Sequence, residues 1–268
     1  MPTQPLKYEG FTYEQVFKDY EAFIQKFKEA REKTTDECIT PPEVYFEVLR
    51  WLSEHVKLED REIVRPFYPG GDFEKFDYPE RCIVVDNPPF SIRSKITCFY
   101  LERGIDFFLF NPALTLFMPH DVTYVITNAS VRFDNGAELP ISFTTSLFPD
   151  VRIMTAADLR DALVRIFKKA IGASNKKQKH FVWPPCVLSS ARGNFFDVDV
   201  KIKKSECLFT KKACCKDVYG AAFLLSDAAT ERLEAARAAT RADKPTLQLS
   251  ESDRAIIARL NAQCDGDG

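Results

Sequence analysis

The stretch that decides the fold is residues 82–91, CIVVDNPPFS. Its first half is a short run of apolar, mostly β-branched residues, which is typical of a buried strand. An amide side chain, two prolines and an aromatic ring follow at the carboxyl end of that strand. Because proline fixes φ and removes a backbone donor, the turn is stiff and rich in acceptors. We expect the Asn87 side-chain oxygen and the Pro88 carbonyl to face one amino group, with Phe90 stacking on a flat base.

The residues around this stretch alternate between helix-like and strand-like patterns. Apolar residues at three- and four-residue spacing predict helices over residues 12–33, 43–55, 91–103 and 156–170. Apolar runs and alternation predict strands at residues 82–86, 105–110, 122–133 and 139–146, and residues 63–72 are predicted to be a short strand running into a tight loop. Residues 134–136, Asp-Asn-Gly, join the last two strands as a hairpin. Strand–helix–strand repeats followed by a hairpin indicate an α/β fold with a mostly parallel sheet and an antiparallel strand at its end.

The residues Asn87, Pro88, Pro89 and Phe90 resemble the catalytic motif of the amino-group methyltransferases that use S-adenosylmethionine, chiefly the DNA adenine-N6 type. The resemblance implies that these four residues are catalytic and that the cofactor is S-adenosylmethionine. It also implies a Rossmann-like class I methyltransferase sheet, here reduced in size. The alternative interpretation of the motif is a proline-rich turn that simply ends a core strand.

The segment 65–71, RPFYPGG, is similar to the glycine-rich cofactor loop of the same family. Arg65 stands where the family has an acid, and Pro69 stands where it has its first glycine. Glycine lets the backbone approach a ligand closely, so Pro69 is a departure. The resemblance assigns to cofactor binding the residues Pro66, Phe67, Gly70, Gly71 and Asp72.

The segment between this loop and the catalytic motif is short. In the family, two strand–helix units usually separate the two motifs, whereas here about 15 residues do, too few for an ordinary crossover. A competing alignment treats Gly71 and Asp72 as an acidic loop before the catalytic strand, which leaves no glycine loop. In either alignment the acid that binds the cofactor ribose is not identifiable; Asp72 and Asp77 are candidates without a spacing argument.

A third match precedes the first strand. Asp36 and the pair Thr40-Pro41 resemble the motif by which related methyltransferases hold the methionine end of the cofactor. A helix N-terminus with a hydroxyl and backbone N–H groups suits a carboxylate. The alternative role of Thr40 is ordinary capping of the helix. The whole resemblance covers roughly residues 36–146. Over this range the chain is similar to the compact adenine methyltransferase-like proteins of bacteriophages and prophages.

Positive charge is concentrated in residues 151–220, which hold 15 Lys and Arg against six Asp and Glu, a net charge of +9. Because the whole chain carries −2, the remainder carries −11. Basic clusters interleaved with aromatic residues favour contacts with nucleic-acid phosphates and bases. We expect DNA contacts from Lys176, Lys177, Lys179, Lys203 and Lys204. The alternative is a solvated lysine-rich face beside a small β core.

The cysteines and the chain ends indicate the compartment. Eight cysteines lie without the paired spacing of a metal or redox motif, which fits a reducing cytoplasm better than a disulfide framework. No zinc pattern joins His180 to the cysteines that follow it, so no metal is expected. The sequence shows no apolar stretch long enough to span a membrane and no N-terminal signal pattern.

The predicted organisation has four parts. An N-terminal helix in residues 1–35 packs on the core, a methyltransferase-like catalytic domain covers 36–155, and a basic target-recognition region with some β structure covers 156–220. A helical segment covers 221–268, and Ser250 with Asp253 predicts the cap of its last helix.

The expected function is methyl transfer to adenine N6 in double-stranded DNA, with the target base flipped out of the duplex. Roles in restriction–modification or in phage gene regulation are both compatible with that activity. Two alternatives stay open. One is a nucleic-acid-binding protein with weak or no activity on a methyltransferase-like scaffold, and the other is amino-group methylation of RNA or protein.

Overall fold

The structure is a computed structural model that describes residues 40–58, 60–67, 72–133, 136–167, 183–190, 200–237 and 248–266. Seven strands form a mixed, mostly parallel sheet in the order β1-β2-β3-β5-β4-β6-β8, and three form an antiparallel sheet in the order β7-β10-β9. The α/β class and the mostly parallel sheet predicted from the sequence are therefore confirmed. The helix expected over residues 12–33 lies outside the described residues.

The chain divides into two compact units, and the predicted four-part organisation stays a prediction. The first unit comprises residues 1–109 and 132–138, and the second comprises 110–131 and 139–268.

The described elements of the first unit follow the predicted alternation. They are α3 (Pro42–His55), β1 (Ile63–Val64), β2 (Ile83–Asp86), a 3₁₀ turn (Phe90–Ile92), α4 (Arg93–Arg103) and the start of β3 (Asp106–Pro112). The three strands are parallel, with Ile83 of β2 in register with Ile63 of β1 and with Asp106 of β3. Between β1 and β2 the described residues contain no helix, so this connection is as short as the sequence predicts.

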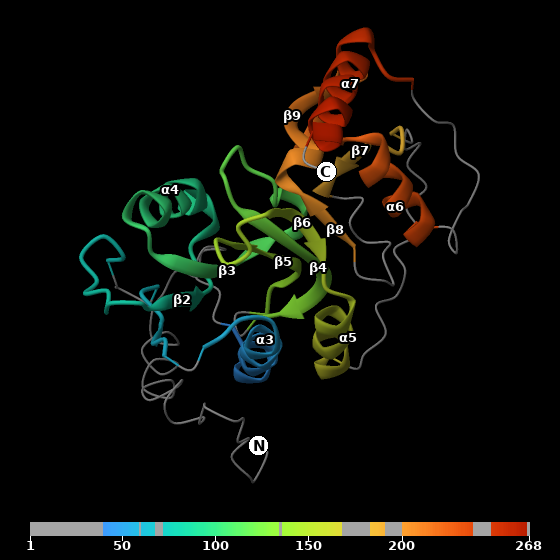
Figure 1. The fold of residues 1–268 in the computed structure, drawn as a ribbon. Helices are drawn as coiled ribbons and strands as arrows, with labels where there is room; N and C mark the ends of the chain where they lie inside the picture. Colours follow the sequence, from blue (N-terminus) through green and yellow to red (C-terminus); the bar gives the residue numbers. More distant parts are fainter. Residues whose placement is uncertain are drawn as a thin grey trace. The chain divides into compact units, whose positions relative to one another are not determined.

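Helices α3 and α4 cover opposite faces of β3. Successive side chains of a strand point to opposite faces of the sheet. Phe107 contacts Tyr100 of α4, with ring centroids 5.7 Å apart, whereas its neighbour Phe108 contacts Trp51 of α3 at 5.9 Å. Figure 1 shows the two helices on either side of β2 and β3. This explains why residues 83–85 of β2 and 107–110 of β3 form continuous apolar runs rather than alternating.

Local chemistry sets the ends of these helices. Pro42 occupies the first position of α3, where its missing N–H costs nothing. Gly104 follows α4 in the left-handed conformation, with φ 62°, and its N–H donates to the carbonyls of Tyr100 and Leu101. The predicted end of this helix at residue 103 is confirmed.

The second unit contains most of the predicted hairpin. Its elements include β4 (Thr123–Arg132), β5 (Glu138–Thr145), β6 (Val151–Thr155), α5 (Ala157–Ile166) and β8 (Lys201–Lys203). The turn is closed where the Phe133 N–H donates to the Ala137 carbonyl at 2.8 Å. The hairpin strands were expected at the end of the sheet, and that placement is wrong. Strand β6 pairs in parallel with β4, and β8 pairs antiparallel with β6, so the sheet continues beyond the hairpin.

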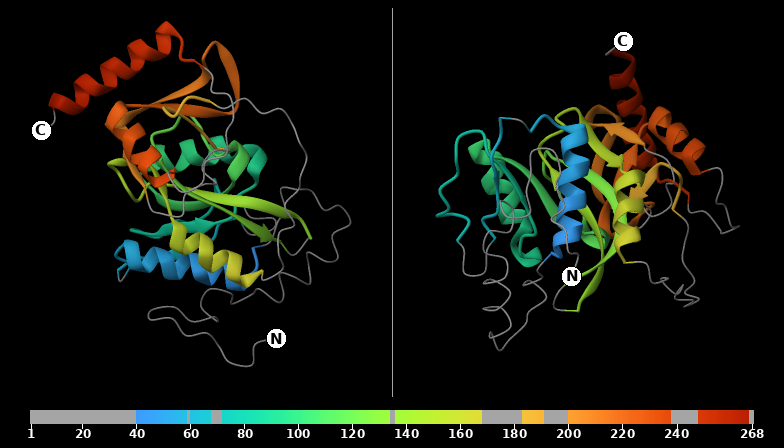
Figure 2. Two further views of the ribbon diagram at one scale, coloured as in Figure 1. Left: turned by 90° about the vertical axis from the view of Figure 1, so that its right-hand side faces the viewer. Right: turned by 90° about the horizontal axis from the view of Figure 1, so that it is seen from below.

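A small antiparallel sheet with two helices completes the second unit. It contains β7 (Val187–Ser189), β9 (Cys207–Ala213) and β10 (Lys216–Leu225), followed by α6 (Asp227–Arg237) and α7 (Glu251–Gly266). Ile257 of α7 joins a core cluster with Val187, Val218 and Leu224. Figure 2 shows α7 in red beside the orange β9–β10 hairpin.

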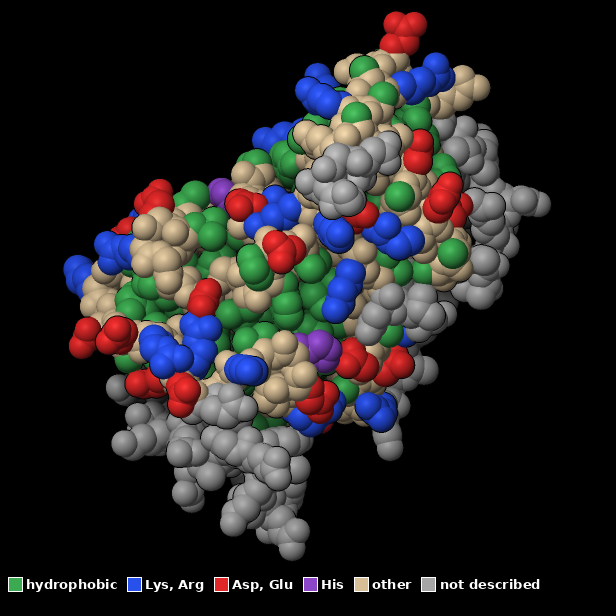
Figure 3. Space-filling view, viewed as in Figure 1, with side chains coloured by type: hydrophobic (Ala, Val, Ile, Leu, Met, Phe, Trp, Pro, Cys, Tyr) green, Lys and Arg blue, Asp and Glu red, His purple; other side chains and the backbone are tan. Residues whose placement is uncertain are grey.

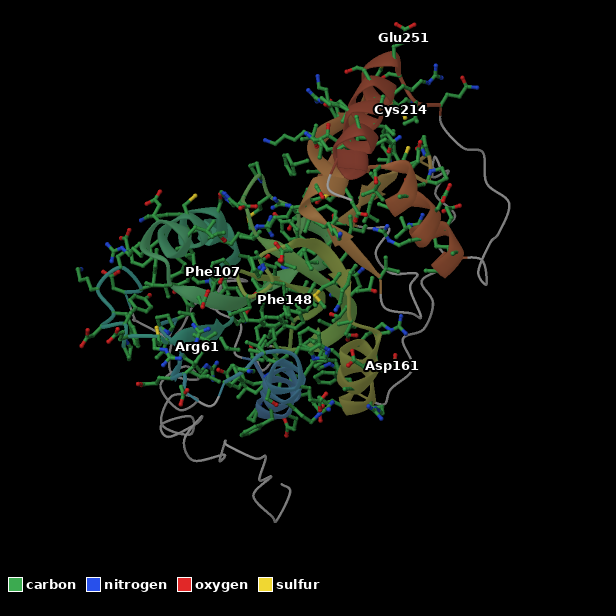
Figure 4. All side chains as sticks on the ribbon, in the orientation of Figure 1. Arg61, Phe107, Phe148, Asp161, Cys214 and Glu251 are labelled. Carbon is green, nitrogen blue, oxygen red and sulfur yellow. The ribbon has the colours of Figure 1, made fainter. Side chains whose placement is uncertain are left out.

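The start of α7 is tied to this hairpin. Asp253 Oδ2 accepts hydrogen bonds from the Ser250 N–H and the Ser250 hydroxyl, and the Asp253 N–H donates to Ser250 Oγ. The predicted cap is therefore confirmed. The same Asp253 oxygen accepts the Cys214 N–H at 2.8 Å, which brings the turn between β9 and β10 to the first turn of α7, near Glu251 (Figure 4).

No helix in the described ranges combines the length and the apolar character that crossing a membrane requires.

Candidate functional site

The predicted catalytic motif lies between a buried strand and a helix. All four residues of β2 are buried, and the motif begins directly after Asp86. Pro88 is buried, whereas Asn87, Pro89 and Phe90 are half-buried. Phe90 begins the 3₁₀ turn that runs into α4. The strand–turn–helix context predicted for this motif is therefore present.

Asp86 joins the motif to the segment that follows β1. Its side chain is 3% exposed. Oδ1 accepts the Asn87 N–H at 2.9 Å and two hydrogen bonds from the Arg65 guanidinium, both at 3.2 Å. Oδ2 accepts the Phe67 N–H at 3.0 Å. One carboxylate thus fixes both the end of β1 and the start of the motif.

Arg65, which stands where the methyltransferase family has an acid, is held by two partners. It forms the ion pair with Asp86, and its guanidinium carbon lies 4.2 Å from the centroid of the Tyr45 ring. An acid at position 65 would place a second negative charge beside the buried Asp86 carboxylate, which is unfavourable. An arginine at position 65, in place of the acid of the methyltransferase family, is therefore consistent with the presence of Asp86.

Tyr45 links the first turn of α3 to the Arg65–Asp86 ion pair. Its N–H donates to the Pro41 carbonyl at 3.1 Å, and its hydroxyl donates to the Val85 carbonyl at 2.7 Å. Burial raises the pKa of the Tyr45 hydroxyl, so it remains a donor at all ordinary pH values. The N-terminus of α3 and the carboxyl ends of β1 and β2 thus meet around Arg65, Tyr45 and Asp86.

Thr40 precedes α3 and is 1% exposed. Its hydroxyl oxygen has no hydrogen-bond partner within the described part of the chain. Pro41 is the N-cap residue, and no side chain caps this helix. The alternative in which Thr40 caps α3 is therefore wrong. A buried hydroxyl without a partner is costly, and a ligand that accepts or donates a hydrogen bond there would remove that cost.

The remaining predicted cofactor residues are distributed unevenly. Pro66 is buried and Phe67 is half-buried beside Asp86. Asp72 is exposed and is occupied within its own turn, where it pairs with Lys75 at 2.8 Å and accepts the Glu74 N–H. Hydrogen bonding from Lys75 lowers the pKa of Asp72. Three assigned positions lie outside the described residues: Asp36, Gly70 and Gly71.

An aromatic cluster that the sequence analysis did not identify supports this region. It consists of Phe67, Phe73, Tyr78, Phe99 and Tyr100, whose rings contact one another at centroid distances of 5.2–6.4 Å. The Tyr78 and Tyr100 hydroxyls lie 3.1 Å apart. Burial raises the pKa of both hydroxyls. The cluster packs the segment after β1 against α4. The sequence signal for it is the high phenylalanine content, 23 of 268 residues.

The two described lysines of the predicted DNA surface differ. Lys203 is exposed on β8. Lys204 forms an ion pair with Asp121 at 2.8 Å, and Arg152 pairs with the same carboxylate. Both partners lower the pKa of Asp121, the Lys204 hydrogen bond most strongly. Lys204 is therefore engaged within the chain, although one carboxylate shared by two cations leaves a net positive charge at this point. Lys176, Lys177 and Lys179 lie outside the described residues.

Positive and negative side chains are mixed on one face of the described residues. In Figure 3, Lys and Arg side chains are interspersed with Asp and Glu on the face shown. Among the residues that can be described, no group of three metal-binding side chains occurs. Burial raises the pKa of the Cys186 thiol to about 11 and that of Cys207 to about 12, so both thiols are protonated at neutral pH.

The class of protein that these elements define is an α/β protein with a mostly parallel sheet and a candidate site at the carboxyl ends of β1 and β2. In open α/β sheets, ligands bind at that edge of the strands. No family model, curated protein or solved structure matches the chain.

Proposed function

We propose that this protein transfers a methyl group from S-adenosylmethionine to the N6 amino group of adenine in DNA. The observation that carries the proposal is the position of the motif 87–90. It follows a buried strand directly, and Asp86 anchors it to the segment after the adjacent strand β1.

The chemistry required of the chain on the substrate side is modest. The lone pair of adenine N6 is delocalised into the ring, so the nitrogen is a poor nucleophile. Two acceptors, Asn87 Oδ1 and the Pro88 carbonyl, would take hydrogen bonds from both N6–H groups and localise the lone pair on nitrogen. The bond between N6 and the methyl carbon would form as the bond between that carbon and the cofactor sulfur breaks. The proton would then leave the cationic N6 for water. Phe90 would hold the flipped base by stacking.

When bound, the cofactor supplies an electrophilic methyl group on a sulfonium. Residues present in the chain fit one end of such a molecule, the methionine end. The N-terminus of α3 and the buried Thr40 hydroxyl, which lacks a partner among the described residues, suit the methionine carboxylate. Pro66 and Phe67 lie beside the motif through the Phe67–Asp86 contact. Placing both reactants at one strand edge would supply most of the rate gain by proximity.

A second candidate function is nucleic-acid binding without methyl transfer. The observation that favours it is the short connection between β1 and β2, which contains no helix in its described residues. Asp72, one candidate for the ribose acid, is engaged with Lys75. Calorimetry with S-adenosylmethionine separates the two proposals, because only the enzyme requires binding of the cofactor.

The direct test is incorporation of a labelled methyl group into adenine-containing DNA. We expect incorporation by the wild type and its loss in Asn87→Ala. Asn261→Ala is a matched control, because it removes the same side chain from α7, where Asn261 bonds only Asp227 among the described residues. Equal incorporation by Asn87→Ala and Asn261→Ala would exclude the proposed role of Asn87.

A further inference from the structure

Strand β10 contains an irregular stretch opposite β9. Asp217 is in register with Lys212, and the next paired residue, Ala222, is in register with Thr210. Residues 218–221 of β10 therefore lie opposite Lys211 alone. Bulges of this kind redirect a side chain and recur beside functional sites.

The backbone of this bulge is held from both sides. Gly220 has φ 72°, and a Cβ at this position would lie 2.2 Å from the Leu114 carbonyl oxygen. Ser190 donates its hydroxyl to the same carbonyl at 2.8 Å. Ala221 also has a positive φ, 63°, which is strained for a residue with a side chain. Val218, on the other side of the bulge, is buried in the core of the small sheet.

This arrangement leaves Tyr219 projecting outward. Tyr219 is 78% exposed, whereas Val218 and Ala221 of the same stretch are buried. Packing therefore does not account for a large aromatic residue here. Strained backbone of this kind recurs at ligand contacts, and here it holds one large ring in solvent.

Exposed lysines accompany the ring. Lys211 and Lys212 of β9 and Lys216 of β10 are exposed. Lys212 lies 3.9 Å from Asp217, an ion pair between two well-exposed side chains that contributes little. We call Tyr219, Lys211, Lys212 and Lys216 the bulge surface.

We propose that the bulge surface binds an unpaired base of DNA, which stacks on Tyr219 while the lysines contact the flanking phosphates. The choice of DNA as the partner rests on the proposed function. An acidic protein segment would require the lysines alone, whereas an exposed ring among lysines is the combination that binds single-stranded nucleic acid.

The test is binding of a fluorescent oligo(dT) of about 12 nucleotides, within the site sizes of such surfaces, to the full chain. Thymine has no exocyclic amino group, so the probe cannot use the proposed catalytic contacts of Asn87 and Pro88. We expect Tyr219→Ala to weaken binding roughly 5- to 100-fold and Tyr219→Phe to change it less than about twofold. Replacing the three lysines with Ala should reduce the salt dependence of binding.

Phe76→Ala is the matched control, because Phe76 is an exposed aromatic residue outside the bulge surface. It should bind as the wild type does. A cross-link from iodouracil-containing DNA should map to Tyr219, which tests the contact without any substitution. The proposal is overturned if Tyr219→Ala binds oligo(dT) as well as Phe76→Ala, or if the wild type does not bind it at low salt. Failure of methyl incorporation with intact oligo(dT) binding would instead contradict the proposed function alone.

Discussion

At the residue scale, the Asp86 carboxylate connects β1 to the proposed catalytic motif through Arg65, Phe67 and Asn87. Asp86→Asn keeps the shape but removes the charge that faces the Arg65 guanidinium. We expect a loss of about 1–3 kcal/mol in the free energy of unfolding, because hydrogen bonds to a buried charged group are strong. Urea unfolding measures it.

The control for that change is Arg132→Gln, which breaks the exposed ion pair with Glu138. Exposed pairs contribute about 0–1 kcal/mol. An Asp86→Asn cost no greater than that of Arg132→Gln would show that the Asp86 contacts do not hold the site.

Gly220 gives a second prediction at this scale. Gly220→Ala adds a Cβ that meets a backbone carbonyl and strains a positive φ, so we expect a loss of about 2–4 kcal/mol. Gly136→Ala is matched to it, since Gly136 also has a positive φ, 83°, but, its chain neighbours aside, no atom of the described residues lies within 4 Å of the added Cβ. That control should cost about 1 kcal/mol. Equal losses of unfolding free energy for Gly220→Ala and Gly136→Ala, measured by thermal unfolding, would show that the Leu114 carbonyl does not restrict the backbone at Gly220.

At the element scale, the cap of α7 also holds the β9–β10 hairpin. Asp253→Ala removes the acceptor for Ser250 and for the Cys214 N–H. We expect a loss of about 1–2 kcal/mol, the upper range for a helix cap. Glu251→Ala, in the same first turn but exposed, should cost less than about 0.5 kcal/mol. Similar midpoints in urea for the two variants would contradict the double role of Asp253.

Element prediction succeeded where the pattern was local. The apolar runs of β2 and β3, the spacing in α3 and α4, the helix end at residue 103 and the cap at Ser250 were all readable in the sequence. The turn between β9 and β10 was not, because its positive-φ positions hold Cys214 and Cys215 rather than the Asn-Gly or Asp-Gly that marks such turns. Strand β6 is only five residues long and carries too little alternation to be predicted.

The candidate site was predictable in part for the same reason. The motif 87–90 has its signal within a few adjacent residues, so its strand–turn–helix setting was foreseen. The contact of Arg65 with Asp86 depends on the parallel register of β1 and β2, and that of Tyr45 depends on how α3 packs on the sheet. Neither packing nor register is specified by local spacing.

At the scale of the whole molecule, the cysteines report on the packed cores. Burial raises the pKa values of Cys186 and Cys207, so little thiolate forms below about pH 11. In native protein at pH 8 we expect iodoacetamide to modify the exposed Cys215 and to leave Cys186 and Cys207 unmodified. Peptide mass spectrometry measures this, with urea-unfolded protein as the control in which all three react. Modification of Cys207 at the rate of Cys215 would contradict the described packing.

The central claim concerns the reaction at the edge of the sheet. The most direct measurement is mass-spectrometric quantification of N6-methyladenine in DNA after incubation with the protein and S-adenosylmethionine. We predict N6-methyladenine with the wild type and with Asn261→Ala, and a loss of at least about 100-fold with Asn87→Ala, since misplacing the reacting group costs that much. DNA that contains no N6-methyladenine after incubation with the wild type, under conditions in which the protein binds DNA, would contradict the account.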